Sequence, residues 1–222
     1  MTCSNIFDMK NIPIYYDQLK GKKFFTDSLS TINTYNKQIH LIYYKKNNIP
    51  ICTFPKLNLI VISRIGFLSF CYNFYIFINS FKTEDIKISK KNISLIGKFA
   101  LSHEIGHILD PNLSKIKSKS TEILISIAKN IIKYNIDIKN TYYYEKNLPL
   151  ELEDCIIQFK KNIILREINA WNIAKNIINF EDIMEQYIFE NMNEYAIATY
   201  NYGNFKNIIS EHNIENYIKI LI

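Results

Sequence analysis

The sequence contains few cysteines, and none of them forms a pair that would indicate a disulfide or a cysteine metal site. The chain has Cys3, Cys52, Cys71 and Cys155, without a C-x-x-C motif or the spacing of a disulfide framework. We therefore expect reduced thiols. Residues 1–10 also lack the uninterrupted apolar stretch of a signal peptide. Both absences predict a cytoplasmic protein.

An uninterrupted hydrophobic run is also missing. The longest apolar stretch, 57–78, is nearly long enough to span a bilayer, but Arg64 lies within it and Asn58 and Asn73 interrupt it. Its β-branched and aromatic residues favour two buried strands instead, separated by a break at residues 63–66. We therefore expect no membrane partner.

Positive charge is in excess but is not concentrated. The formal net charge is +6, and the lysines are scattered along the chain. The densest cluster comprises Lys115, Lys117 and Lys119, in a Ser-rich segment that we interpret as a solvated loop. Neither a recognition motif nor interleaved basic and aromatic residues supports binding to nucleic acid. We expect no nucleic-acid partner, and the oligomeric state stays open.

Glycine and proline are scarce, with five of each, whereas apolar residues make up 48% of the chain. This composition suffices for a hydrophobic core, and the length suits one domain over residues 1–222. Within it we distinguish an N-terminal segment (1–40), a sheet region (40–80) and a helical part (92–222). The sequence therefore predicts an α+β fold, with a small N-terminal sheet followed by a mostly helical core.

Short β-branched and aromatic runs separated by turn residues predict the strands. They are His40–Tyr44, Ile49–Phe54, Leu57–Ser63, Phe67–Cys71 and Phe74–Asn79. Apolar residues at spacings of three and four predict the helices. These cover Ser28–Lys37, a segment from Asn92 or Ser94 to just before Pro111, Ser120–Tyr134, Leu150–Asn179, and shorter helices toward Ile222.

The most informative motif is His103-Glu104-Ile105-Gly106-His107, at the end of an expected helix. At positions i and i+4 the two histidines project from one face and can bind one metal ion. Glu104 can reach a metal-bound water without being a ligand, as a general base must. With 4 histidines and 13 glutamates in the chain, chance would produce such a motif about 0.004 times. The motif therefore predicts a hydrolytic centre with one catalytic Zn²⁺ ion.

The surroundings of the motif agree with a centre at the edge of a core. Ile96 and Phe99 precede His103 by seven and four positions, so the histidine face continues an apolar face. Gly106 is unfavourable in a helix interior and is tolerated where a neighbouring backbone or a substrate comes close. Asp110 returns to the ligand face and could fix a histidine tautomer, although helix termination before a proline explains it equally well.

A catalytic zinc ion usually has three protein ligands, so a further residue must complete this centre. The extended motif H-E-x-x-H-x-x-G-x-x-H is excluded, because Asp110 and Leu113 replace its glycine and last histidine. The best candidate is Glu167, whose helix face carries two small residues and Trp171 and could pack closely on the histidine helix. The alternative leaves Glu167 on a solvated face beside Arg166. Rival acidic residues are Glu122, Glu151, Glu153, Asp154 and Glu190.

The segment from Lys98 to His107 resembles the active helix of the ImmA/IrrE-type zinc metallopeptidases, in which an Arg/Lys-Phe-Thr-Leu-Ala segment leads into H-E-x-G-H. Residues 167–170 are similar to the E-x-x-A segment that supplies the third ligand of that family. The resemblance implies a zincin-like core of the gluzincin type, with His103, His107 and Glu167 binding zinc and Glu104 activating water. Lethal-factor-like peptidases are a second resemblance, since they also carry H-E-x-x-H-x-x-D.

These features predict a zinc metallopeptidase, a hydrolase that acts on a protein or peptide substrate. An oxyanion stabiliser is also expected, and the candidates are Tyr195, Tyr200, Tyr202 and His212. Two alternatives stay open. One is a regulatory or binding protein that keeps the zincin fold without turnover, and the other is a helical interaction module without a metal.

Overall fold

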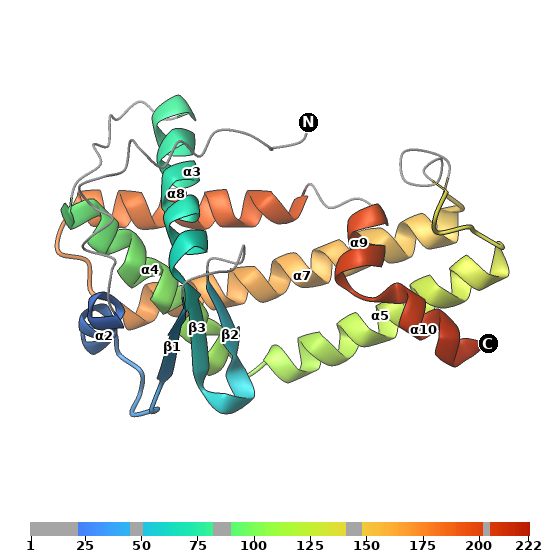
Figure 1. Cartoon of the computed structure of the whole chain (residues 1–222), viewed down its shortest axis with the longest axis horizontal. Helices are drawn as coiled ribbons and strands as arrows, with labels where there is room; N and C mark the ends of the chain where they lie inside the picture. The colour runs from blue at the N-terminus through green and yellow to red at the C-terminus, as the bar shows by residue number, and fades with distance from the viewer. Residues whose placement is uncertain (1–21, 45–50, 82–89, 141–147, 202–204) are drawn as a thin grey trace. The chain divides into compact units, whose positions relative to one another are not determined.

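The computed structural model describes residues 22–44, 51–81, 90–140, 148–201 and 205–222 (Figure 1). Its elements are three strands and predominantly helices, which confirms the expected α+β class with a small N-terminal sheet and a helical core. The chain forms two compact units, one of Met1–Asp110 with Ala170–Tyr195 and one of Pro111–Asn169 with Ala196–Ile222. Two helices contribute to both units: α7 (Leu150–Ile177), and α8 (Ile183–Asn201), of which residues 196–201 belong to the second unit.

The sheet of the first unit contains β1 (His40–Tyr44), β2 (Ile51–Phe54) and β3 (Leu59–Ser63). The strand order is β1-β3-β2, with β1 parallel and β2 antiparallel to β3. Alternation along β3 places Ile60 and Ile62 in the core, where neither is exposed to solvent. Three predicted strands are therefore confirmed, although the last begins after a short 3₁₀ turn at Pro55–Leu57.

The two strands predicted at 67–71 and 74–79 are wrong, because this segment belongs to the helix α3 (Arg64–Phe81). Gly66 does not break the chain there, since its backbone N–H donates to Ser63 Oγ at 3.2 Å and Ser63 thereby caps the helix. The buried residues follow a helical spacing that the β-branched and aromatic composition concealed. They are Phe67, Cys71, Phe74 and Ile78. No helix in the described part of the chain is long and apolar enough to cross a membrane.

The other helices of the first unit are α2 (Lys22–Ser30), α4 (Lys90–Leu109) and α8 (Ile183–Asn201). The helix predicted at Ser28–Lys37 is therefore misplaced, because α2 ends at Ser30 and the positive φ angles of residues 35 and 36, 48° and 63°, are incompatible with a helix there. The expected end of α4 before Pro111 is confirmed, but α4 begins at Lys90 rather than at either predicted N-cap. Figure 1 shows α4 beside the sheet, and it contacts α2 and β2.

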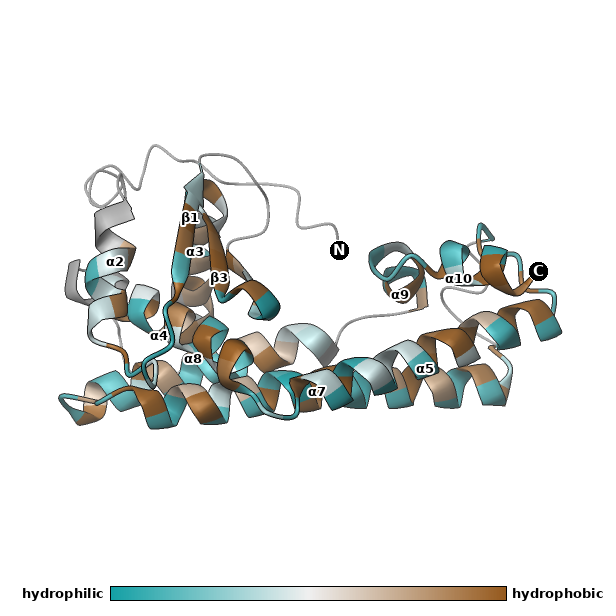
Figure 2. Ribbon diagram, turned by 90° about the horizontal axis from the view of Figure 1, so that it is seen from below, coloured by the Kyte–Doolittle hydropathy of each residue, from teal (hydrophilic) through white to brown (hydrophobic). Residues whose placement is uncertain are grey.

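The second unit contains α5 (Leu113–Lys133), the first part of α7, α9 (Phe205–Glu211) and α10 (Ile214–Leu221). The lysine cluster 115–119 lies on the exposed face of α5. The loop predicted for this segment is therefore wrong, whereas the predicted exposure of the lysines to solvent is confirmed. Apolar and polar residues alternate along α5 in Figure 2, and the apolar ones face a core shared with α7, α9 and α10. Members of this core include Ile127, Phe159 and Ile208.

The cysteines in the described residues are free thiols, as expected for reduced thiols: Cys52, Cys71 and Cys155. Burial raises the pKa of the Cys71 thiol far above its ordinary value. Cys3 lies outside the described residues, as do residues 49 and 50 of the second predicted strand.

Candidate metal centre

The last turns of α4 present both histidines of the motif to the same side. The imidazole rings of His103 and His107 lie 4.7 Å apart between centroids, at an interplanar angle of 74°. One and two turns earlier on the same face, Phe99 and Ile96 are fully buried. The expectation that the histidine face continues an apolar face is therefore confirmed, and the rings lie at the margin of the core.

Gly106 lies where the backbone of α7 comes closest to α4. An added Cβ at position 106 would lie 2.9 Å from the carbonyl carbon and 3.0 Å from the Cα of Ala170, closer than real side chains pack. The interpretation of Gly106 as a site of close backbone approach is confirmed, and the partner is the residue one turn after Glu167. Ala170 and Ala174 are fully buried and Trp171 is 2% exposed, so this face of α7 forms the contact.

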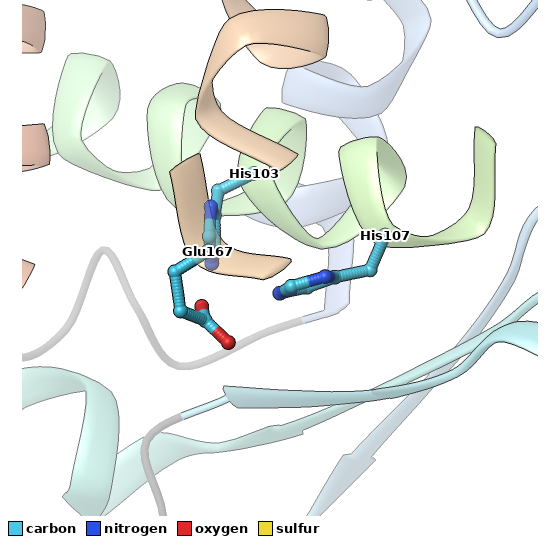
Figure 3. A group of neighbouring side chains, drawn as sticks. All are labelled: His103, His107 and Glu167. Atoms are coloured by element: carbon cyan, nitrogen blue, oxygen red, sulfur yellow. The ribbon is translucent and has the colours of Figure 1, made fainter. Parts of the chain in front are cut away.

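This contact brings Glu167 to the two histidines (Figure 3). One ligand atom from each of His103, His107 and Glu167 lies within 4.8 Å of the others. Glu167 is only 2% exposed, so the alternative of a solvated face is wrong. The rival acidic residues Glu122, Glu151, Glu153, Asp154 and Glu190 are all exposed.

The carboxylate of Glu167 is held by its neighbour in the sequence. Arg166 donates from Nε at 2.9 Å and from a terminal guanidinium nitrogen at 2.7 Å, both to Oε1 of Glu167. A buried carboxylate needs such a partner, because desolvation without compensation is costly. In the sequence Arg166 is compatible with a solvated face, whereas in the structure its guanidinium holds the carboxylate of the candidate ligand.

Glu104, the expected general base, is 8% exposed and follows His103 directly on α4. The negative charge of Glu104 influences a thiol on the edge strand β2. Burial raises the pKa of the Cys52 thiol, and the carboxylate of Glu104 raises that pKa further. The base therefore lies within electrostatic range of the strand that packs against α4.

Trp171 contacts a candidate ligand directly, which the sequence analysis did not anticipate. Its indole stacks on the imidazole of His103 with centroids 4.4 Å apart and planes inclined by 28°. The sequence places Trp171 on the same helix face as Glu167 but carries no signal of the residue that it contacts. That contact depends on the approach of two helices that are distant in the sequence.

The lesser candidates lie in different surroundings. Asp110 is 8% exposed and directly follows Leu109, the last residue of α4. Tyr195, on α8, packs among Phe70, Phe74 and Phe77 with ring centroids 5.0–6.0 Å away. His212 belongs to the second unit.

The ring of His212 lies 4.8 Å from that of Phe159, and a small cavity beside it is also lined by Tyr200. Tyr202 lies outside the described residues. The group that could hold a metal comprises only the two histidines and Glu167 among the described residues.

The donor set fits a zinc ion. Two imidazole nitrogens and one carboxylate oxygen form the three-ligand set typical of catalytic zinc, which leaves the fourth position for water. One ligand atom of each side chain lies within 4.8 Å of those of the other two, so the three side chains could bind one ion together.

Comparisons with protein-family models, with curated proteins and with solved structures find no match to this chain.

Proposed function

We propose that this protein is a zinc-dependent metallopeptidase that hydrolyses peptide bonds. The observation that carries the proposal is the convergence of Glu167, from α7, on the two histidines of the H-E-x-x-H motif. A buried third ligand at this position is what the motif requires to form a catalytic rather than an incomplete centre. The resemblance to the ImmA/IrrE-type enzymes of the gluzincin class, and the second one to lethal-factor-like peptidases, remain predictions that agree with it.

The proposed chemistry divides between the metal and the chain. Zinc at such a centre supplies an activated water and a Lewis acid for the scissile carbonyl. His103, His107 and Glu167 would hold the ion. Glu104 would accept a proton from the attacking water and deliver it to the leaving amine as the carbon–nitrogen bond breaks, so that the base returns to its carboxylate form.

A regulatory or binding protein that keeps this fold without turnover is the alternative. Such a protein needs the three ligands but has no use for a base beside them. Glu104 is present and largely buried next to the first ligand, which favours the catalytic proposal. The substrate is proposed to be a protein or peptide, and a cytoplasmic location remains a prediction from the cysteines and the N-terminal sequence.

Zinc content and peptide cleavage, measured on matched variants, test the proposal. We expect about one zinc ion per wild-type chain, loss of zinc in His103→Ala and Glu167→Ala, and cleavage of members of a peptide library detected by mass spectrometry. Glu104→Gln should keep zinc and lose cleavage. Glu153→Gln is the control, because Glu153 is an exposed acid on the same helix as Glu167.

Each contrary outcome has a definite meaning. A wild-type protein that takes up no zinc would refute the metal centre, and zinc retained at full affinity in Glu167→Ala would refute the third ligand. Undiminished cleavage by Glu104→Gln would refute the role of the base. Stoichiometric zinc without cleavage of any library peptide would favour the binding protein.

A further inference from the structure

We propose that Trp171 is a positioning residue that fixes the plane of the His103 imidazole and thereby sets the affinity and geometry of the metal centre. The proposal rests on the proposed function, since it concerns the same centre. It assigns a role that neither the H-E-x-x-H motif nor the third-ligand segment contains. It also explains why a large aromatic residue occupies the tightly packed face of α7.

The contact between the two rings has the geometry of aromatic stacking. The planes of Trp171 and His103 are inclined by only 28°, with centroids 4.4 Å apart, at the short end of the separations of about 4.5–7 Å found in aromatic pairs. The indole is 2% exposed, so it covers one face of the imidazole and keeps water from it. A ring held on one face can turn only within the stacking plane, which restricts the direction of its nitrogen lone pairs.

Trp171 is itself held in place by a closed chain of aromatic contacts. Its indole meets the ring of Phe189, on α8, edge to face at 5.3 Å and 75°. Phe189 in turn meets Phe99 edge to face at 5.3 Å and 86°. Phe99 lies one turn before His103 on α4. The contacts therefore run from α4 through α8 and α7 back to α4, and all four rings belong to the first unit.

The position of Trp171 along α7 links the two ligand helices. It follows Glu167 by four residues, so the candidate ligand and the stacking residue project from the same side of α7. The close contact of Ala170 with Gly106 lies between them and sets how deeply both reach toward α4. His103 also meets His107 edge to face at 4.7 Å, so the ring that Trp171 covers packs directly on the second histidine.

Loss of the stacking partner should weaken metal binding without removing a ligand. Residues that orient metal ligands typically contribute about 10–100-fold to metal affinity. We expect Trp171→Leu to bind zinc at least about tenfold more weakly than the wild type. Trp171→Phe, which restores a stacking ring, should remain within about threefold.

The experiment measures zinc affinity by competition with a chromophoric chelator, and cobalt coordination by visible absorption. Phe25→Leu is the matched control, because Phe25 is a buried aromatic residue of the first unit that packs on Phe67. We expect weakened zinc binding and an altered cobalt spectrum in Trp171→Leu, and wild-type behaviour in Phe25→Leu. Circular dichroism of each metal-free variant shows that it is folded.

The outcomes separate this proposal from the proposed function. If the wild type binds one zinc ion and Trp171→Leu matches it in affinity and cobalt spectrum, the positioning role is overturned while the metal centre stands. An equal loss in Trp171→Leu and Phe25→Leu would also overturn it, since the effect would then be general destabilisation. A wild type that binds no zinc overturns both.

A readout on the unmodified protein covers the case in which Trp171→Leu does not fold. Trp171 is the only tryptophan of the chain, so all tryptophan fluorescence comes from the residue that stacks on His103. Stoichiometric Co²⁺ should quench the emission in the wild type, because the ion would be bound by the ring on which the indole stacks. Cobalt binding without quenching would overturn the contact and the proposal with it.

Discussion

Replacing Gly106 by alanine tests the close approach of α4 and α7 most directly. The added methyl group would lie 2.9 Å from the carbonyl carbon of Ala170, whereas ordinary contact begins at 3.4 Å. Ala170 must therefore move by at least 0.5 Å, the difference between these values. The obstruction is backbone, so no change of side-chain rotamer can relieve it.

Two opposing contributions determine the change in the free energy of unfolding. Alanine is preferred over glycine in a helix interior by about 0.8–1.0 kcal/mol. Overpacking a core costs about 1–3 kcal/mol, and a clash with backbone belongs at the upper end of this range. We therefore expect Gly106→Ala to be destabilised by about 1–2 kcal/mol. The same displacement moves Glu167 away from the histidines and should lower zinc affinity by roughly tenfold.

Urea denaturation of the metal-free protein and zinc competition measure the two effects. Ser94→Ala is the control, because Ser94 is an exposed position on the same helix and gains helix propensity without a clash. If Gly106→Ala unfolds at the same or a higher urea concentration than the wild type and binds zinc equally well, the two helices do not approach as closely as described.

Two further predictions concern charged groups. Arg166→Met should lower the stability of the metal-free protein by about 1–3 kcal/mol, because it removes both hydrogen bonds to the buried Glu167 carboxylate. Zinc should then raise the melting temperature of Arg166→Met more than that of the wild type, and equal shifts would contradict this. Burial lowers the pKa of His212 below 6.5, with Glu211 opposing and Arg166 adding to the shift. As the pH falls below about 6.5, the unfolded chain binds a proton at His212 before the folded chain does. The folded state therefore loses stability as the pH falls from about 6.5 to the lower pKa of His212 in the folded protein. The stability advantage of the wild type over His212→Gln should therefore shrink between pH 7.5 and 5, and a constant difference would refute it.

The fold could be predicted from the sequence where short-range periodicity decides the structure. The strand His40–Tyr44 follows from a short run of apolar, β-branched and aromatic residues, and the end of α4 before Pro111 follows from proline sterics. The helix α3 was missed because its aromatic and β-branched residues favour strands, while its apolar face repeats at helical spacing. Burial against the rest of the first unit overrides the local preference there, and no local signal reports on burial.

The candidate site likewise contains some features that could be predicted from local sequence and others that could not. Two histidines at i and i+4 are brought together by one helix, so their proximity could be predicted without knowledge of the fold. The burial of Glu167 could be anticipated because small residues follow it at helical spacing. The stacking of Trp171 could not, because it depends on how α7 is rotated and how closely it approaches α4. The bond from Arg166 to Glu167 could not either, because side chains at i and i+1 of a helix do not ordinarily face each other.

Gly106, the glycine of the motif, connects the features of the site that could be predicted from the sequence with those that could not. Gly106 is unfavourable within a helix, and its cost is offset only because α7 occupies the space of the missing side chain. That contact fixes where along α4 Glu167 lies beside the histidines. One turn further along α7, it also fixes where Trp171 stacks on His103. A change at Gly106 should therefore disturb both ligand helices together, whereas Trp171→Leu should disturb only His103. The zinc affinity of the variant that combines Gly106→Ala with Trp171→Leu distinguishes these two cases. If both residues act through His103 alone, the double variant binds zinc no more weakly than the weaker single variant. If Gly106 also sets the position of Glu167, the double variant binds zinc more weakly than either single variant.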